Sequence, residues 1–215
     1  MATGKFITFE GGEGAGKSTQ AALLRDRLMK AGLRVVLTRE PGGTPRAEGI
    51  REALLSGRVK PLGPLAETVL FYVARDSHLE LTIRPALARG SWVVCDRFFD
   101  STRAYQGAAG GVSLAVLDGL ERAVVAHTRP DLTVMLDLPA EEGLRRAGLR
   151  AAAEAGARDR FETMNLLFHA NLRQEFLDIA AAEPRRCVVV DAARPVDEVA
   201  AAVWTAVKQR LPGLA

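Results

Sequence analysis

The chain has 215 residues, of which 48% are hydrophobic and 26% charged, and its formal net charge is +3. A chain of this length buries about 70% of the surface that it exposes when unfolded, so it needs no disulfide or metal to form a core. The composition excludes disordered and fibrous proteins. Cys95 and Cys187 lie within apolar runs, so we expect buried thiols and no secreted disulfide framework.

The distribution of apolar and basic residues bears on location and partners. No segment approaches the roughly 20 apolar residues that span a bilayer, and the first residues lack an apolar stretch of signal-peptide length. The basic residues comprise 24 Arg and 5 Lys, with no block of like charge interleaved with aromatic residues. We therefore expect a cytoplasmic protein that binds neither membrane nor nucleic acid.

Short apolar runs alternate with longer helical patterns along the whole chain. The apolar runs are typical of buried parallel strands and comprise Phe6–Phe9, Val35–Thr38, Trp92–Cys95, Leu132–Leu138 and Cys187–Val190. The helical patterns comprise Lys17–Ala31, Ala47–Leu55, Leu65–Ala88, Leu114–Ala126, Ala140–Ala153, Phe161–Ala182 and Val196–Leu211. The alternation predicts an α/β fold, a five-stranded parallel sheet flanked by helices on both faces. We expect residues 1–215 to form one domain, with a mobile lid near residues 145–162.

The strongest motif follows the first predicted strand and precedes the first predicted helix. It matches the pattern GxxxxGK[ST] and consists of Gly11, Gly12, Glu13, Gly14, Ala15, Gly16, Lys17 and Ser18, followed by Thr19. In such a P-loop, glycines let backbone N–H groups surround phosphate oxygens at a helix N-terminus. Lys17 is then expected to reach the β- and γ-phosphates, and the Ser18 hydroxyl to coordinate Mg²⁺. The sequence therefore predicts a P-loop NTPase fold that binds a nucleoside triphosphate together with Mg²⁺.

Asp96 and Arg97 stand at the end of the third predicted strand, where an open α/β sheet binds its ligands. Asp96 suits a water-mediated Mg²⁺ contact, and Arg97 suits bidentate binding of an acceptor phosphate. A structural ion pair between the two residues is the alternative interpretation. The sequence contains neither Asn-Lys-x-Asp nor Asp-x-x-Gly, which disfavours a GTPase switch.

Further segments give the chain a resemblance to the bacterial thymidylate kinase family. They are Phe9–Ser18, Thr38–Thr44, Phe71–Arg75, Asp96–Gln106, Arg129–Leu132 and Leu136–Asp137. The resemblance covers essentially the whole chain in order. It implies transfer of the γ-phosphoryl group of ATP to dTMP, with Mg²⁺ as cofactor, by a homodimer.

The resemblance also implies how the acceptor dTMP is bound. In this family an aromatic residue at the position of Phe71 stacks on thymine, an arginine at the position of Arg75 hydrogen-bonds a pyrimidine carbonyl, and a tyrosine like Tyr105 stands against the sugar 2′ position. The candidate dTMP-binding residues are Glu13, Arg51, Phe71, Arg75, Arg97, Ser101, Thr102, Tyr105 and Gln106. Without the family, Phe71 would be interpreted as a core residue and Arg51 as a solvated helix residue.

Lys17 and Arg97 are candidate catalytic residues, together with an arginine from the lid. The variable P-loop positions contain no Arg, so the resemblance implies that the lid supplies this charge, with Arg158 and Arg160 favoured over Arg146 and Arg150. No general base is needed, since a phosphate monoester with a second pKa of about 6 is already mostly dianionic at neutral pH. A kinase for another small acceptor and a regulatory ATPase stay open as alternatives.

Overall fold

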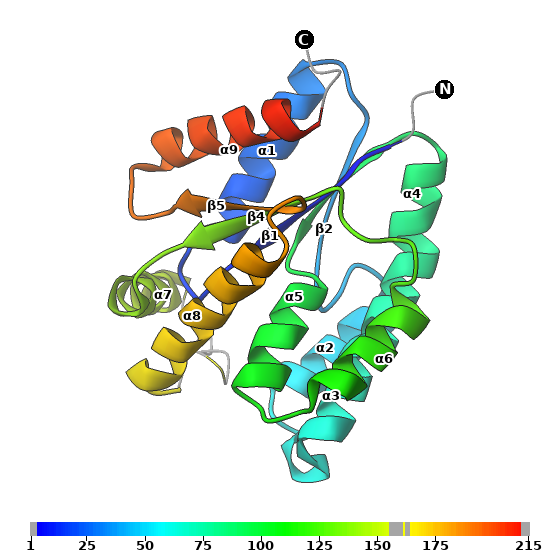
Figure 1. Cartoon of the computed structure of the whole chain (residues 1–215), viewed down its shortest axis with the longest axis vertical. Helices are drawn as coiled ribbons and strands as arrows, with labels where there is room; N and C mark the ends of the chain where they lie inside the picture. Colours follow the sequence, from blue (N-terminus) through cyan, green and yellow to red (C-terminus); the bar gives the residue numbers. More distant parts are fainter. Residues whose placement is uncertain (1–3, 155–160, 162–163, 212–215) are drawn as a thin grey trace.

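The computed structural model describes residues 4–154, 161 and 164–211, and a parallel sheet forms its centre (Figure 1). The strands lie in the order β2-β3-β1-β4-β5 and every pairing is parallel. They are β1 (Phe6–Glu10), β2 (Val35–Arg39), β3 (Trp92–Asp96), β4 (Leu132–Asp137) and β5 (Cys187–Asp191). The predicted five-stranded parallel sheet is confirmed.

Burial of the strands follows their position in the sheet. Side chains of β1 are buried throughout, and those of β3 and β4 are buried up to their last residue. β2 and β5 form the two edges and are partly exposed, with Val189 of β5 45% exposed. The expectation that every strand is buried on both faces is thus wrong for the edges, because an edge strand has a neighbour on one side only.

Helices connect the strands, and polar side chains cap several of them. The α-helices are α1 (Lys17–Lys30), α2 (Pro45–Leu55), α3 (Gly63–His78), α4 (Arg84–Ala88), α5 (Phe99–Thr102), α6 (Leu114–Val124), α7 (Ala140–Glu154), α8 (Leu166–Ala182) and α9 (Val196–Arg210). Thr44, Ser113 and Asn165 cap α2, α6 and α8, each accepting a backbone N–H of the first turn. Because Asn165 is the N-cap, α8 begins at Leu166 and not at Phe161 as predicted.

Two segments with the wider winding of a π-helix extend helices. Leu79–Ile83 joins α3 to α4, so the helix predicted over Leu65–Ala88 exists but is unevenly wound. Arg103–Ala108 continues α5, a helical segment that the sequence analysis did not predict. Across Phe99–Ala108, aromatic, Ser, Thr and Gly residues of modest helix propensity stand beside the good helix formers Arg103, Ala104 and Gln106, so local propensity alone does not decide the conformation. π-Helical turns recur at functional sites.

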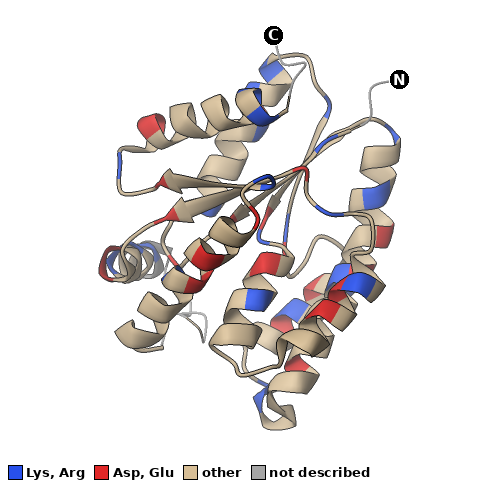
Figure 2. Cartoon of the chain, viewed as in Figure 1, with Lys and Arg blue, Asp and Glu red and all other residues tan. Residues whose placement is uncertain are grey.

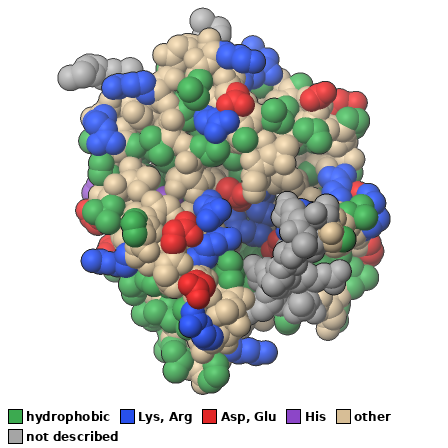
Figure 3. Space-filling view, turned by 180° about the vertical axis from the view of Figure 1, so that it is seen from behind, with side chains coloured by type: hydrophobic (Ala, Val, Ile, Leu, Met, Phe, Trp, Pro, Cys, Tyr) green, Lys and Arg blue, Asp and Glu red, His purple; other side chains and the backbone are tan. Residues whose placement is uncertain are grey.

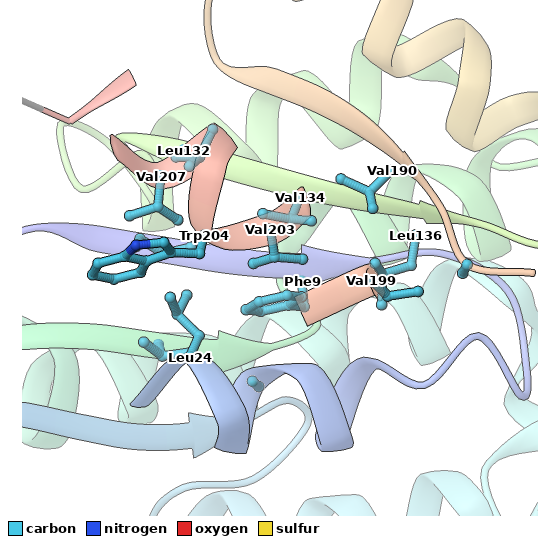
Figure 4. Packing of buried hydrophobic residues seen from close by; sticks show 14 of the residues in the cluster. Phe9, Leu24, Leu132, Val134, Leu136, Val190, Val199, Val203, Trp204 and Val207 are labelled. Atoms are coloured by element: carbon cyan, nitrogen blue, oxygen red, sulfur yellow. The ribbon is translucent and has the colours of Figure 1, made fainter. Parts of the chain in front are cut away.

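The helices cover both faces of the sheet. α1 and α9 pack on one face, where Phe9, Leu24 and Trp204 belong to one buried cluster (Figure 4). α3, α4 and α6 pack on the other face around Tyr72 and Leu117. α8 covers that same face beside β4 and β5. Among the described residues, no helix combines the length and the apolar character required to cross a bilayer.

Candidate active site

Charged residues gather where the strands end (Figure 2). β1, β3, β4 and β5 end in Glu10, Asp96, Asp137 and Asp191, and Arg97 follows β3 at once. On the face opposite to that of Figure 1, Lys and Arg side chains gather near the centre, beside acidic ones (Figure 3). The carboxyl edge of a parallel sheet is where ligands bind, so the predicted site residues are expected there.

The loop between β1 and α1 has the wound backbone that a phosphate cradle requires. Gly11, Gly14 and Gly16 have φ angles of 135°, 67° and 84°, which residues with a side chain rarely adopt. A Cβ on Gly14 would lie 2.1 Å from the backbone oxygen of Gly143 in α7. Glycine at position 14 therefore serves both the turn itself and the close approach of α7.

Lys17 and Ser18 occupy the N-terminus of α1, and Thr19 follows them in the same helix. Lys17 Nζ donates to the carbonyl oxygen of Gly12 at 2.7 Å. Burial and the neighbouring Arg97 guanidinium lower the pKa of Lys17 to about 8. The lysine is thus buried within the loop that it is expected to serve.

Ser18 Oγ, in the first turn of α1, donates to the carboxylate of Asp96 at the end of β3. A hydroxyl and a carboxylate oxygen side by side fit a Mg²⁺ ion that keeps several of its waters and takes phosphate oxygens as further ligands. Among the described residues no group of three or more His, Cys, Asp and Glu side chains forms a metal site made by protein alone. The residues present therefore fit Mg²⁺ bound together with a nucleotide.

Arg97 lies at the centre of a polar cluster that joins the P-loop to α5. Arg97 Nη2 donates to Glu13 Oε1 at 2.7 Å and to the Tyr105 hydroxyl at 3.2 Å, and Nη1 donates to Ser101 Oγ at 3.1 Å. The Tyr105 hydroxyl donates to Glu13 Oε1 at 2.6 Å. Arg97 is thus paired with Glu13 while Asp96 is bonded to Ser18, so the alternative of an ion pair between Asp96 and Arg97 is not what the described residues form.

The backbone and the charges of this cluster are both unusual. Arg97 has a φ of 68°, in the left-handed region that non-glycine residues seldom occupy and that is enriched at active sites. Burial opposes ionisation of Glu13, but the Arg97 guanidinium and the Lys17 ammonium outweigh it and lower the pKa of Glu13 to about 2. Burial raises the pKa of Tyr105 well above its ordinary value. At neutral pH, therefore, Glu13 is anionic and Tyr105 neutral.

Arg75 is 2% exposed and is held by two partners. Its Nε donates to Glu40 Oε2 at 2.8 Å, and its Nη2 donates to Thr102 Oγ1 at 3.0 Å. Its Nη1 is buried and has no hydrogen-bond partner among the described residues. A buried donor without a partner costs about 1–3 kcal/mol, and a ligand acceptor would remove that cost.

Phe71 and Gln106 lie on the same side of the sheet as Arg75. Phe71 is half-buried, whereas its neighbour Tyr72 is 1% exposed and belongs to the core. Without the family resemblance, Phe71 would be interpreted as a core residue. In the structure the aromatic core residue of this segment is Tyr72, and Phe71 is only partly buried. Gln106 Nε2 donates to Glu67 Oε1 at 3.1 Å, deep between α3 and the segment after α5.

The remaining predicted residues lie apart or outside the described residues. Arg51 on α2 donates from Nη1 to the carbonyl oxygen of Pro41 at 2.8 Å, in the loop after β2. Residues 145–154 of the predicted lid belong to α7, where Arg146 bonds to Glu142. Arg158 and Arg160 lie outside the described residues.

Several buried polar residues join the site without having been singled out from the sequence. Glu10 accepts the backbone N–H of Phe98 at 2.7 Å and the hydroxyl of Ser101 at 2.6 Å. Burial and the Asp100 carboxylate raise the pKa of Glu10 to about 8. Glu40, which binds Arg75, lies within the Thr38–Thr44 segment that carries the family resemblance. Its place in that segment was the one sequence signal that could have indicated a role in the site.

His169 of α8 is also buried, and its Nε2 has no hydrogen-bond partner among the described residues. Burial lowers its pKa, while the Glu13 carboxylate acts in the opposite direction. His78 is fully buried as well, whereas His127 is exposed. His78 and His169 lie within helices and His127 in the turn after α6, and the sequence around them gives no signal that distinguishes buried from exposed histidines.

Comparisons with known proteins agree with this geometry. The family profile described as "Thymidylate kinase" matches residues 9–203. The curated protein named "Thymidylate kinase" from Bradyrhizobium sp. (strain ORS 278) is 57% identical over 208 residues, which cover 97% of this chain and 91% of the relative. The protein of the same name from Nitrobacter hamburgensis is 55% identical, with 97% and 90% covered.

A solved structure extends the likeness from sequence to fold. The crystal structure of thymidylate kinase from Ehrlichia chaffeensis matches with a TM-score of 0.76 and 33% identity, over 96% of this chain and 99% of that chain. The matches run from the P-loop to the last helix and so include every element that carries a candidate site residue. This chain therefore belongs to the thymidylate kinase family.

Proposed function

We propose that this thymidylate kinase transfers the γ-phosphoryl group of ATP to dTMP, giving ADP and dTDP, at the carboxyl edge of its sheet. Membership of the family supports ATP as donor and dTMP as acceptor. The Arg97 cluster carries the assignment of the site, because one buried guanidinium lies between Glu13 of the P-loop and Tyr105 of the acceptor side. In-line transfer needs the reacting atoms of the two phosphates at about 3–3.5 Å, and Arg97 would lie at that junction.

On the donor side, backbone N–H groups of the P-loop would bind the phosphates of ATP. Lys17 would exchange its bond to the Gly12 carbonyl for oxygens of the β- and γ-phosphates. Ser18 would coordinate Mg²⁺ directly and Asp96 through water. When bound, the ion neutralises charge that develops on the phosphate oxygens.

On the acceptor side, Arg97 would bind the phosphate of dTMP, with Glu13 and Ser101 holding its guanidinium. Tyr105 would stand against the sugar. At neutral pH the phosphate is already a dianionic nucleophile, so the site needs to position it and to exclude water. No residue is required to abstract a proton.

Around the base, Phe71 would stack on thymine, and Arg75 Nη1 would find its missing acceptor in a thymine carbonyl. Thr102 and Gln106 would support this contact from the segment after β3, and Arg51 would approach the acceptor from α2. Arg158 or Arg160 would bring a further positive charge to the γ-phosphoryl group when the lid closes.

We also propose a homodimer that works in the cytoplasm. Leu65, Val69 and Val73 are exposed and recur every four residues on α3, and exposed Leu114 and Val116 lie on α6, which packs beside α3. Such an apolar stripe is typical of a surface that pairs with a partner. The free, buried thiols of the described chain fit a reducing compartment.

The test is ADP release measured with ATP and Mg²⁺ against dTMP, dUMP, dCMP, AMP, GMP and thymidine. We expect turnover with dTMP to exceed that with every other acceptor. Preference for another monophosphate would retain the kinase and remove the roles given to Phe71, Arg75 and Tyr105. ATP hydrolysis that ignores every acceptor would contradict the proposal.

A further inference from the structure

A chain of buried polar groups lies behind Arg75 and reaches from β2 to α5. Thr38 Oγ1 lies 2.7 Å from His78 Nε2, and His78 Nδ1 lies 3.0 Å from Glu40 Oε1. The other carboxylate oxygen, Glu40 Oε2, accepts from Arg75 Nε, and Arg75 Nη2 donates to Thr102. His78, Glu40 and Arg75 are 0%, 5% and 2% exposed. Water therefore has little access to the links from His78 to Arg75, whereas Thr38 at the β2 end is only partly buried.

The chemistry of the groups decides the direction of the bonds. A carboxylate can only accept hydrogen bonds, so His78 Nδ1 must donate to Glu40. In the neutral imidazole the other nitrogen, Nε2, is then an acceptor for the hydroxyl of Thr38. Each oxygen of Glu40 thus has one partner, and His78 determines how the carboxylate is turned toward Arg75. Without His78, one oxygen of a buried carboxylate would lose its donor.

Aromatic rings fix the plane of the Arg75 guanidinium but not its rotation within that plane. The guanidinium carbon lies 4.7 Å from the ring centre of Tyr72 and 5.2 Å from that of Phe98. The bonds to Glu40 and Thr102 set the remaining rotation. They leave Nη1 as the donor with no partner among the described residues. The direction of Nη1 therefore depends on how Glu40 is held.

The loop after β2 is shaped around the imidazole of His78. A Cβ on Gly43 would lie 2.4 Å from His78 Nε2 and 2.7 Å from Thr38 Oγ1, and Gly43 has a φ of 83°. The hydroxyl of Thr82 donates to the carbonyl oxygen of Gly43 at 2.9 Å, which ties the loop to the helix beyond α3. A glycine at this position thus makes room for the contact between His78 and Thr38.

We propose that His78 is a positioning residue for recognition of the acceptor base. It acts through Glu40 to hold Arg75 so that Nη1 donates to a thymine carbonyl. The inference deepens the proposed function and rests on the role given there to Arg75. His78 would thus help the enzyme to discriminate between pyrimidine bases without contacting the substrate itself.

Two substitutions of His78 separate its two nitrogens. The side-chain amide of asparagine can replace Nδ1 and retain the donor to Glu40, whereas that of glutamine reaches the position of Nε2 and retains the bond to Thr38. We expect His78→Gln to raise the KM for dTMP by about 10- to 100-fold and to leave the KM for ATP within about twofold. We expect His78→Asn to stay within about threefold of the unsubstituted enzyme in both constants.

Discrimination between bases gives a readout that a merely structural residue would not move. The two acceptors are dTMP and 5-methyl-dCMP, which carries an amino group in place of one thymine carbonyl. The ratio of their kcat/KM values should fall in His78→Gln, in Glu40→Gln and in Arg75→Met, and should be retained in His78→Asn. His127→Asn, which changes an exposed histidine, is the matched control and should leave the ratio unchanged. Thermal unfolding of each variant checks that it is folded.

The outcomes separate the inference from the proposed function. If Arg75→Met leaves the ratio unchanged, the role given to Arg75 is wrong, and the inference is overturned with it. If Arg75→Met lowers the ratio while His78→Gln does not, the inference alone is overturned. Equal losses in His78→Asn and His78→Gln, or a parallel rise in both KM values, would also overturn it. Because His78 acts through Glu40, the double variant with Glu40→Gln should lose no more than the more affected single variant.

Discussion

At the scale of single residues, the proposed acceptor side of the site contains an ion pair, Arg97 with Glu13, whose two side chains are oriented by further hydrogen bonds. The side chains of Arg97 and Glu13 are 18% and 14% exposed and lie 2.7 Å apart. A pair this buried is oriented by its hydrogen bonds, and Tyr105 and Ser101 supply them. In the proposed role, Arg97 would meet the acceptor phosphate already positioned, so removing its side chain should weaken binding of the acceptor more than binding of the donor.

We expect Arg97→Ala to raise the KM for dTMP by about 100-fold, since a charge-assisted bidentate contact of up to about 3 kcal/mol is lost. The KM for ATP should stay within about twofold. Arg97→Lys should recover only part of the loss, because an ammonium cannot bind two phosphate oxygens as a fork. Steady-state kinetics with each substrate varied in turn gives both constants. An equal rise in the two KM values would show that Arg97 is structural.

The lowered pKa of Glu13 predicts that the stability of the fold depends on pH. The pKa of the Glu13 carboxyl is about 2 in the folded protein and 4.5, its ordinary value, in the unfolded chain. Between these two pH values this carboxyl therefore binds more protons in the unfolded chain than in the folded protein. The stabilisation is therefore complete above pH 4.5 and is lost as the pH falls through 2. We expect Glu13→Gln to lower the free energy of unfolding by about 3 kcal/mol at pH 7.

Urea unfolding of Glu13→Gln and of the unsubstituted protein at several pH values measures this difference. The gap between the two proteins should narrow as the pH falls below 4.5. Glu52→Gln is a suitable control, since Glu52 is an exposed partner of Arg58 on the surface. A gap that stays constant down to pH 3 would contradict the assigned pKa.

At the scale of elements, the loop between β2 and α2 connects the edge of the sheet to α3, which carries the proposed base-binding residues Phe71 and Arg75. Thr44 caps α2 and its hydroxyl lies 2.9 Å from Ser77 Oγ of α3. Gly43 contacts His78 of the same helix. The loop therefore transmits the position of β2 to α3, where Phe71 and Arg75 lie.

Gly43→Ala should disturb this loop, because a Cβ there meets the ring of His78 and the φ of 83° is strained for alanine. We expect a rise of at least tenfold in the KM for dTMP. Gly49→Ala is the matched control, since no atom lies within 4 Å of its Cβ and α2 should gain about 0.5–1 kcal/mol. Kinetics and thermal unfolding of both variants check the prediction. Similar behaviour of the two variants would argue against a special role for the loop.

At the scale of the whole molecule, the described part of the single chain leaves the apolar stripe of α3, the helix proposed to bind the base, exposed on one side. Val69 and Val73 are 40% and 45% exposed, while Tyr72 and Arg75 on the same helix are buried. The buried side of α3 thus carries Arg75 of the proposed site, and its exposed apolar side carries Val69 and Val73 of the proposed dimer interface. Pairing of two chains would restrain the helix that carries Phe71.

We expect Val69→Glu to convert the dimer into monomers, because a charge buried in an apolar interface is costly. Met29→Glu on α1, which covers the other face of the sheet, is the matched control and should leave the dimer intact. Sedimentation velocity at micromolar concentration distinguishes the two states. An unsubstituted protein that sediments as a monomer would contradict the proposed dimer.

Local patterns explain how far prediction from the sequence succeeded. The apolar runs that begin at Phe6 and Trp92 identified their strands because buried parallel strands are apolar throughout. The segment Phe99–Ala108 was missed because its aromatic, Ser, Thr and Gly residues weaken the local helical signal, while its contacts with Glu10 and Glu67 come from distant parts of the chain. The start of α8 was placed too early because Phe161 continues the apolar pattern, while the cap at Asn165 decides where the helix begins.

The sequence by itself determined the P-loop, the order of strands and helices, and the segments that identify the family, because each depends on residues that are neighbours in the chain. Only the tertiary structure decided that Glu10 holds Ser101, that Glu40 lies between His78 and Arg75, and that Arg75 keeps one donor free of partners among the described residues. These contacts join positions 35 to 91 residues apart. No local pattern carries such information, since burial and hydrogen-bond partners arise only when the strands and helices have packed together.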